Sequence, residues 1–310
     1  MADRTVVHTA AGDIRPEDMG VTLAHEHFYI RPTGGFEASD PLHPDYVRNV
    51  REARSFKAVG GNTIVDMSVY GFRRDVLGCR RLTEETGVHV ICSTGLRDEV
   101  FYPDWVRETP LEELEALFHK EILEGIDGTD VRAGVIKAGT GFNSMSEVEK
   151  RVMEMCARVQ RDTDVPITTH CDKGTMGVEE AEVFLAAGAD PTRVILGHVD
   201  IPEDTDYLKR LCDMGFNVEI DHMGRFERGT EPTRVAMIRD LFAAGYGGQI
   251  LLAGDLGDPE KYLQAFGGAP GLEYIPKYFV PLLLEGGITQ EQVDQMLIEN
   301  PRRVFALREV

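Results

Sequence analysis

Six side chains of the kinds that bind metal ions stand at or near the ends of short apolar runs. They are four histidines, one aspartate and one lysine: His25, His27, His170, His198, Asp255 and Lys137. Neutral imidazoles and carboxylates are common protein ligands of zinc, iron, cobalt and nickel. Because residues i and i+2 of a strand point the same way, His25 and His27 should share a face and Glu26 should point away. The pattern predicts a site for divalent metal ions.

The lysine narrows the kind of metal site. An ammonium group is repelled by a metal ion, so Lys137 must lose its proton or take up CO2 as a carbamate. A carbamate offers two oxygens and can bridge two metal ions, which together hold a hydroxide and polarise a carbonyl or phosphoryl oxygen. The alternative role for Lys137 is a Schiff-base nucleophile, as in an aldolase.

Each residue also has an ordinary interpretation. A single His-x-His pair is often incidental, and His170 and His198 could be hydrogen-bonded core histidines. Asp255 could cap the helix that follows it. These interpretations weaken when the residues are taken together, because the six fall at five strand ends in one register.

The chain alternates between short β-branched runs and longer stretches with helical periodicity. The eight expected strands are 21–27, 62–68, 89–95, 133–140, 166–171, 194–199, 217–221 and 249–255. The clearest helices between them are expected at 110–125, 146–162, 178–187 and 204–214. Eight such units in 310 residues predict an α/β fold, a parallel (β/α)8 TIM barrel with its active site at the carboxyl ends of the strands.

The main alternative fold is an open, doubly wound sheet. That fold needs a glycine-rich turn after its first strand, whereas the run HEHFYIRPTGG places its glycines too late to open a helix. We therefore expect residues 1–310 to form a single barrel domain. The segment Ile288–Leu307 is expected to add an extra helix and a terminal piece that covers part of the barrel.

Composition excludes several classes of function. With 33 Lys+Arg against 53 Asp+Glu, the net charge of −20 argues against nucleic acid or an anionic membrane surface as partner. The start of the chain has no apolar stretch typical of a signal peptide, and no apolar run is long enough to span a bilayer. Five cysteines without a Cys-x-x-Cys pair favour a reducing, cytoplasmic location.

The ordered set of metal-type residues resembles the phosphotriesterase family of the amidohydrolase superfamily, including the phosphotriesterase-like lactonases and the phosphotriesterase homology proteins. The resemblance runs nearly end to end. It includes GVTLAHEH, STGLRDEVFYPDWV, GVIKAGT, PITTHC, RVILGHVD, QILLAGD and MLIENPRRVF. The lysine of GVIKAGT is the position that this family carbamylates, although some homology proteins carry glutamate there.

Carried over residue by residue, the resemblance implies a binuclear centre. It gives the more buried metal ion three ligands, His25, His27 and Asp255. It gives His170 and His198 to the more exposed ion, and it makes Lys137 a bridging carbamate. The metals would be zinc, with cobalt, manganese or iron as alternatives. A bridging hydroxide would be the nucleophile, and Asp255 would move its proton to the leaving group.

The substrate-facing loops depart from the lactonase pattern. Arg97 stands at or near the place where lactonases commonly have tyrosine, and it could bind a substrate anion or simply pair with Asp98 or Glu99. We also expect substrate contacts from three further side chains: His222, Arg225 and Tyr102. Arg228, Arg31 and Trp105 are further candidates around the mouth. A basic rim in an acidic protein favours an anionic small molecule.

Four functional hypotheses remain open at this point. The first is a binuclear metal hydrolase of a lactone or other carboxylic ester, with phosphotriester hydrolysis as a side activity. The second keeps the metals but cleaves the amide bond of an N-acylated amine or amino acid. A Schiff-base aldolase and a non-catalytic binding protein are the third and fourth. Family members often form dimers, so a homodimer is also open.

Overall fold

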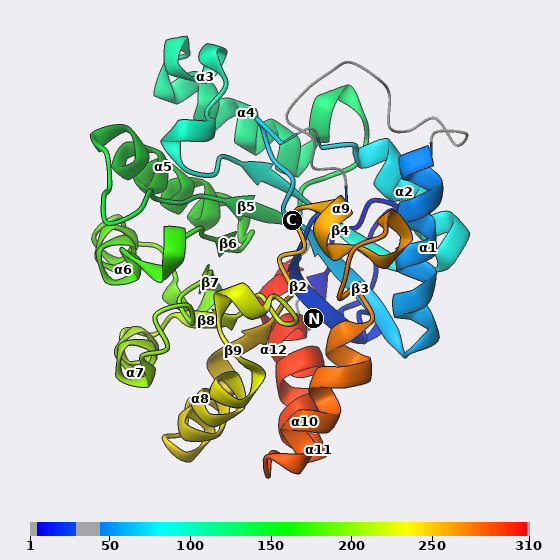
Figure 1. Cartoon of the computed structure of the whole chain (residues 1–310). Coiled ribbons are helices and arrows are strands. Elements are labelled where there is room, and N and C mark those ends of the chain that lie inside the picture. The colour runs from blue at the N-terminus through cyan, green and yellow to red at the C-terminus, as the bar shows by residue number, and fades with distance from the viewer. Residues whose placement is uncertain (1–4, 29–43, 73, 309–310) are drawn as a thin grey trace.

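The computed structural model describes residues 5–28, 44–72 and 74–308. Its centre is a ring of eight parallel strands, and the helices lie outside this ring (Figure 1). The strands follow chain order around the sheet: β2 (Val21–Glu26), β3 (Gly61–Asp66), β4 (His89–Gly95), β5 (Val135–Lys137), β6 (Ile167–Thr168), β7 (Val194–Leu196), β8 (Asn217–Ile220) and β9 (Ile250–Leu252). The predicted TIM barrel is confirmed, and all eight expected strands are present, most of them shorter than the apolar run.

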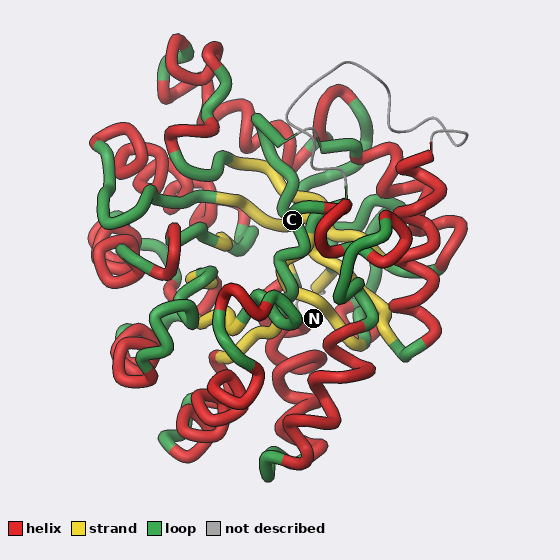
Figure 2. Tube along the Cα trace, in the orientation of Figure 1, coloured by secondary structure: helices red, strands yellow, loops and turns green. Residues whose placement is uncertain are grey.

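Helices connect successive strands, as Figure 2 shows. The longer ones are α1 (Pro44–Ala58), α2 (Val76–Thr86), α4 (Leu111–Leu123), α5 (Glu147–Thr163), α6 (Gly177–Ala186), α7 (Thr205–Asp213) and α8 (Glu231–Ala243). The four expected helices correspond to α4 through α7. The start of α5 is sharp because Ser146 and Glu149 form a capping box, in which each side chain accepts the other residue's backbone N–H. Two short helices, α3 (Asp104–Glu108) and α9 (Pro259–Tyr262), lie in the segments after β4 and β9.

Apolar side chains form two buried clusters. The larger one lies between the strands and the surrounding helices. The smaller one fills the inside of the barrel with residues from several strands, including Val65, Ile91, Val135, Ile195 and Leu251. Because strand side chains alternate between the two faces, each strand can supply both clusters. The barrel is therefore packed and is not a pore.

The last part of the chain closes the amino end of the barrel. It comprises α10 (Val280–Glu285), α11 (Gln290–Asp294), a π-helical turn (Gln295–Glu299) and α12 (Asn300–Phe305). Val304 and Phe305 from α12 complete the inner cluster. This agrees with the expectation that the end of the chain covers part of the barrel. After α12, β10 (Leu307–Arg308) pairs antiparallel with β1 (Thr5–Val6), a small sheet that two-residue strands are too short to reveal in the sequence.

Three site residues leave the strand ends with a left-handed backbone. They are His198 (φ 65°) after β7, His222 (φ 59°) after β8 and Asp255 (φ 46°) after β9. Positive φ is uncommon for residues other than glycine and tends to occur at functional sites. The repeated conformation turns three successive side chains toward the same point at the carboxyl end of the barrel.

Two further features bear on earlier expectations. No helix in the described part of the chain is long and apolar enough to cross a membrane. All five cysteines are buried and unpaired, at 79, 92, 156, 171 and 212.

Candidate active site

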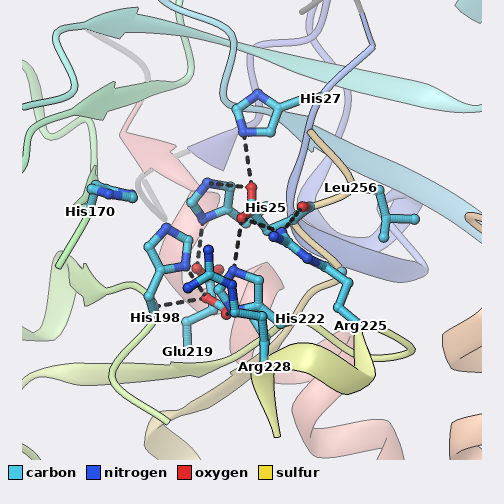
Figure 3. A network of polar contacts seen from close by, with 12 residues as sticks. His25, His27, His170, His198, Glu219, His222, Arg225, Arg228 and Leu256 are labelled. Carbon is cyan, nitrogen blue, oxygen red and sulfur yellow. Dashed lines mark hydrogen bonds and ion pairs between the residues drawn. The ribbon is translucent and has the colours of Figure 1, made fainter. Parts of the chain in front are cut away.

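Four imidazoles present the same ring nitrogen to the carboxyl end of the barrel. His25 and His27 come from the end of β2, His170 follows β6 and His198 follows β7 (Figure 3). The Nδ1–H of His25 donates to Glu219 Oε2 at 2.7 Å, and the Nδ1–H of His198 donates to Asp221 Oδ2 at 2.7 Å. Such bonds fix the tautomer and leave each Nε2 lone pair for a metal ion.

His27 is held by a hydrogen-bond chain that runs through Ser68 to Asp66. Ser68 Oγ donates its proton to Asp66 Oδ1 at 2.7 Å, so the same oxygen is left to accept the Nδ1–H of His27 at 3.3 Å. Asp66 and Ser68 are both buried. His27 therefore has an outer hydrogen-bond partner like those of His25 and His198, and its Nε2 also faces the site.

Burial keeps most of these histidines neutral. Desolvation lowers the pKa of His25 and of His170 well below the usual value, reinforced by Lys137 and Arg97 respectively. The pKa of His198 is also lowered by burial, against the opposing pull of Asp221. A metal ion binds only the neutral imidazole, so the site does not have to lose protons at these residues before loading.

Asp255 is the hub of the cluster. Its Oδ1 lies 3.2 Å from His27 Nε2 and 3.9 Å from His25 Nε2. Its Oδ2 lies 3.0 Å from His222 Nε2 and 2.9 Å from Arg225 Nη1. Burial opposes ionisation of this carboxyl group, but the neighbouring His222 and His27 side chains hold its pKa well below the usual value. Asp255 is therefore a carboxylate that can both bind metal and accept a proton.

Lys137 ends β5 inside the same cluster. Its side chain is 2% exposed, and its Nζ lies 3.0 Å from His25 Nε2 and 3.2 Å from the backbone oxygen of Thr169. Burial, with a contribution from the Arg97 cation, lowers the pKa of Lys137 to about 8. A larger share of the amine is thus unprotonated near neutral pH, which is the form that reacts with CO2.

His222 differs from the other site histidines because it lies between two carboxylates. Its Nε2 faces Asp255, and its Nδ1 forms an ion pair with Asp221. Burial disfavours the imidazolium, but Asp221 and Asp255 outweigh burial and raise the pKa of His222 to about 9. Behind this pair, Asp200 contacts the buried guanidinium of Arg234, with Nε to Oδ2 at 3.2 Å. His222 can therefore hold and pass a proton next to Asp255.

These side chains open into a cavity of about 330 Å³. All six predicted metal ligands line it, together with three cations: Arg97, Arg225 and Lys261. The Arg97 guanidinium lies 4.3 Å from the ring centre of Phe101, and that of Arg225 lies 4.4 Å from the ring centre of Tyr262. The cavity thus has potential metal ligands at its base, and its walls carry cationic and aromatic side chains.

Arg97 both pairs with a neighbouring acid and lines the cavity, the two roles expected for it. One nitrogen, Nη2, donates to His170 Nε2 at 2.6 Å, and the other, Nη1, pairs with Asp98 Oδ1 at 2.8 Å. The ion pair with a neighbouring acid is therefore present, and the side chain nevertheless lines the cavity. His170 can bind metal only if this guanidinium moves away from its Nε2.

The remaining substrate-facing expectations have mixed outcomes. His222 contacts Asp255 but does not line the cavity. Tyr102 is 5% exposed, belongs to the large core cluster and does not line the cavity, because its position after β4 turns the ring inward. Trp105 packs edge-on against Tyr70 and lies outside the cavity lining. Arg228 also lies outside that lining, and Arg31 falls outside the described residues.

Several site residues escape sequence reasoning. Glu219 and Asp221 were not singled out, although two acids two positions apart in a buried strand are an unusual signal. Ser68 had no signal of its own. Lys261 and Tyr262 were not singled out either; they lie on α9, the short helix after Asp255, whose N-cap is Asp258 and not Asp255.

The donor set fits divalent metal ions. Among the described residues, four groups of three side chains bring their ligand atoms within 4.8 Å of one another, and one of them is the predicted set of His25, His27 and Asp255. Nε2 atoms with hydrogen-bonded outer nitrogens and one ionised carboxylate are the ligands that zinc and similar metals prefer.

Comparison with known proteins places the chain among hydrolases by sequence similarity alone. A model of the phosphotriesterase family matches residues 5–305. The phosphotriesterase homology protein of Escherichia coli is 31% identical over 92% of this chain and 98% of its own length. The N-acetyltaurine hydrolase of Danio rerio is 30% identical over 97% of both chains. The phospho-furanose lactonase of Mycoplasmopsis synoviae is 30% identical over 97% of this chain and 92% of its own.

Solved structures show the same architecture. The lactonase of Listeria monocytogenes superposes with a TM-score of 0.90 at 27% identity, covering 98% of this chain and 100% of that one. The E. coli homology protein, solved with phosphate in its active site, gives 0.85 at 30%, covering 93% and 99%. The organophosphorus hydrolase of Deinococcus radiodurans gives 0.87 at 30%, covering 98% of each.

Fold, site and comparisons together define a TIM-barrel hydrolase with its polar cluster at the carboxyl ends of the strands. The chain belongs to the phosphotriesterase family. The named relatives include lactonases, an amide hydrolase and an organophosphorus hydrolase, so family membership alone leaves the scissile bond open.

Proposed function

We propose that this protein is a two-metal hydrolase of a small lactone or carboxylic ester that carries a negative group. One observation supports this most directly: six metal-type donors line one cavity whose walls also present Arg97, Arg225 and Lys261. Hydrolysis of activated phosphotriesters would be a side activity of the same centre. The Schiff-base and binding-protein hypotheses have less support, because Lys137 lies among potential metal ligands and none of the six donors is missing.

The residues divide naturally between two ions. His25, His27 and Asp255 would hold one ion, His170 and His198 would hold the other, and Lys137 as a carbamate would be shared. Zinc is the first choice, with cobalt, manganese or iron as alternatives. When bound, such a pair supplies an activated water at neutral pH and polarises the bond to be cleaved.

Proton transfer falls to Asp255 and His222. As water adds to the ester carbonyl, Asp255 accepts the proton and returns it to the leaving oxygen, so the ester and one water become an acid and an alcohol. His222 donates to Asp255 Oδ2 at 3.0 Å and keeps that carboxylate turned toward the site. The second carboxylate on His222, that of Asp221, keeps the imidazole protonated and in place.

The cations select the charge of the substrate. Arg225 is already paired with Asp255, so its role is to orient that carboxylate and the near part of the substrate. Arg97 and Lys261 are the better candidates for a carboxylate or phosphate, because a guanidinium binds such groups through two N–H donors and an ammonium binds them as a point charge. Arg97 would take this role once metal binding has freed it from His170.

An amide substrate is the second candidate. It is favoured by the N-acetyltaurine hydrolase, which aligns with this chain over 97% of both lengths. An N-acylated amino acid or sulfonate also pairs a scissile carbonyl with a remote anion, so the same cations would bind it. The choice between ester and amide therefore depends on turnover and not on binding of the anion.

The first experiment measures metal content with and without bicarbonate, together with turnover of a small panel. The panel contains neutral lactones, phosphorylated sugar lactones, N-acyl amino acids, N-acetyltaurine and an activated phosphotriester. We expect about two metal ions per chain, better loading with bicarbonate, and fastest turnover of an anionic lactone or ester. Fastest turnover of an N-acyl compound would instead select the amide hypothesis.

Substitution of one ligand provides the internal control. His25→Ala removes the best-buried imidazole, and we expect loss of at least one metal ion and of nearly all turnover. His119→Ala is the matched control, because His119 is a partly exposed histidine on α4 paired with Asp162. Full turnover by the His25→Ala variant would contradict the proposal.

A further inference from the structure

The barrel has a seam at the metal-type cluster. The sheet order begins with β2 and ends with β9, and the two strands lie side by side without ladder pairing between their described residues. One backbone bond crosses the seam at the carboxyl end, from Asp255 N–H to the oxygen of His25 at 3.0 Å. Asp255 therefore lies at the junction of β2 and β9, where few backbone hydrogen bonds connect the strands.

Glu26 supplies the missing connection. It lies between two candidate metal ligands in sequence, but its side chain points the other way and is 1% exposed. Its Oε1 accepts the N–H of Gly254 at 2.7 Å, and its Oε2 accepts the N–H of Leu256 at 3.1 Å. The two hydrogen bonds fix the backbone amides of the residues before and after Asp255, so one side chain holds the backbone on both sides of Asp255.

The backbone of Asp255 requires such stabilisation because it is in the left-handed region, with φ of 46°. A non-glycine residue in that conformation is strained and persists only when its surroundings hold it. The same conformation turns its carboxylate between His27, His222 and Arg225. The position of the hub carboxylate is thus coupled to the contacts of Glu26.

The residue before Asp255 shows how close this contact is. A Cβ atom added at Gly254 would lie 2.8 Å from Glu26 Oε1 and 3.3 Å from Oε2. A side chain at this position would therefore require the Glu26 carboxyl group to move, and it would also lie 3.0 Å from Leu256 Cγ.

We propose that Glu26 is a positioning residue that closes the β2–β9 seam and holds Asp255 in its strained, site-facing conformation. It does not touch the substrate or the reacting atoms. This role rests on the proposed function, since it places a residue that the proposal assigns to metal binding and proton transfer.

The main test is Glu26→Gln, which keeps size and shape but replaces one acceptor oxygen by an NH2 group facing a backbone N–H. We expect zinc affinity, measured by competition with a chromophoric chelator, to fall by about tenfold or more, as is typical when outer partners of metal ligands are removed. We expect kcat to fall with little change in KM, because the substrate contacts remain.

Glu52→Gln is the matched control. Glu52 on α1 is 2% exposed and likewise accepts two backbone amides, those of Ala265 and Leu272, in a segment outside the cavity lining. This variant should lose comparable thermal stability and keep its zinc affinity and kcat. Equal loss of zinc affinity in both variants would reduce Glu26 to a general structural role and overturn the proposal.

Gly254→Ala tests the same contact from the other side, and it remains available if Glu26→Gln does not fold. The added methyl group should displace the carboxylate and lower zinc affinity, whereas combining it with Glu26→Ala should cost less than the sum of the two single changes. Strict additivity would mean that the two residues do not act through one contact, and would count against the proposal.

A fourth measurement does not depend on metal or turnover. Hydrogen exchange of residues 253–257 in metal-free protein should be faster in Glu26→Gln than in wild type or Glu52→Gln. If the wild type binds no metal, the proposed function fails, and this exchange still decides whether Glu26 holds the segment. Unchanged exchange would overturn the seam role.

Discussion

Single residues in this site owe their chemistry to the groups behind them. His25 and His198 each direct Nδ1 at a buried carboxylate, whereas His222 lies between two carboxylates and is the one site histidine with a raised pKa. The same side-chain type thus serves as a neutral ligand in some places and as a charged proton carrier in another. At His222 the contacts with Asp221 and Asp255 outweigh burial, whereas at His25 burial and the Lys137 cation dominate.

Arg97 gives a prediction at this scale. Replacing it by alanine should lower kcat/KM for anionic lactones or esters by about tenfold to a hundredfold, the usual effect of losing a charge-assisted hydrogen bond. Neutral lactones should be affected little. The measurement is kcat/KM for a charged and a neutral lactone of similar size.

Arg132→Ala is the control for this change, because Arg132 precedes β5 at the opposite end of the barrel and pairs with Asp13. An equal decrease for charged and neutral substrates would show that Arg97 supports the site in general and does not select charge.

Strand ends set how closely the site residues approach one another. Gly95 ends β4 with φ of 112°, and a Cβ there would lie 2.1 Å from the backbone oxygen of Lys137 on β5. Pairing of Gly95 with Lys137 in the ladder explains this contact. The position of the lysine backbone therefore depends on a glycine in the neighbouring strand.

Gly95→Ala is the prediction at the scale of elements. It should destabilise the protein by about 1–3 kcal/mol beyond the cost of a left-handed alanine, because the backbone of β5 must shift. Bicarbonate-assisted metal loading should weaken as well. Urea unfolding and metal content measure the two effects.

Gly60→Ala separates strain from contact. Gly60 has φ of 93° and no atom within 4 Å of an added Cβ, so it should show only the left-handed penalty, about 1–2 kcal/mol. Similar stability losses at both glycines would mean that β5 yields freely to the added methyl group.

The molecule as a whole separates stability from chemistry along the barrel axis. The cavity lies at the carboxyl ends of the strands, and α12 packs Val304 and Phe305 into the inner cluster from the other end. Met67 belongs to the inner cluster and also lines the cavity, so the packed interior forms part of the site's base. This division is common in TIM barrels, whose loops at one end vary while the core persists.

Phe305 tests that separation. Phe305→Ala should lower the free energy of unfolding by about 3–5 kcal/mol, because it opens a cavity in a fully buried cluster. Zinc affinity at temperatures well below the melting point should not change. Chemical unfolding and chelator competition on the same sample provide both values.

Phe305→Leu should recover most of the lost stability, since it keeps much of the volume. A parallel decrease in zinc affinity would show that packing at the amino end is transmitted through the barrel to the site.

Local sequence patterns were sufficient to predict the barrel and to select the side chains that line the base of the cavity. β-Branched runs separated by helical stretches determine the order of strands, and the two-residue period of β2 places His25 and His27 on one face with Glu26 on the other. The predicted bounds were least accurate for β5, β6 and β9. Each predicted strand extends beyond the observed one, because residues next to the strand continue the sequence pattern without belonging to the paired strand. Tyr102 was assigned to the mouth because aromatic residues suit both a rim and a core, and the sequence carries no sign of which.

The tertiary structure decided what surrounds those donors. His25 and Glu219 are 194 residues apart, and Glu26 and Gly254 are 228 apart, so only closure of the barrel brings each pair within hydrogen-bond distance. Side-chain types and the β period are properties of a local stretch of chain and can be read from it. Tautomers, pKa shifts and the grip on Asp255 depend on groups that meet only in the folded barrel, and for that reason the sequence alone did not determine them.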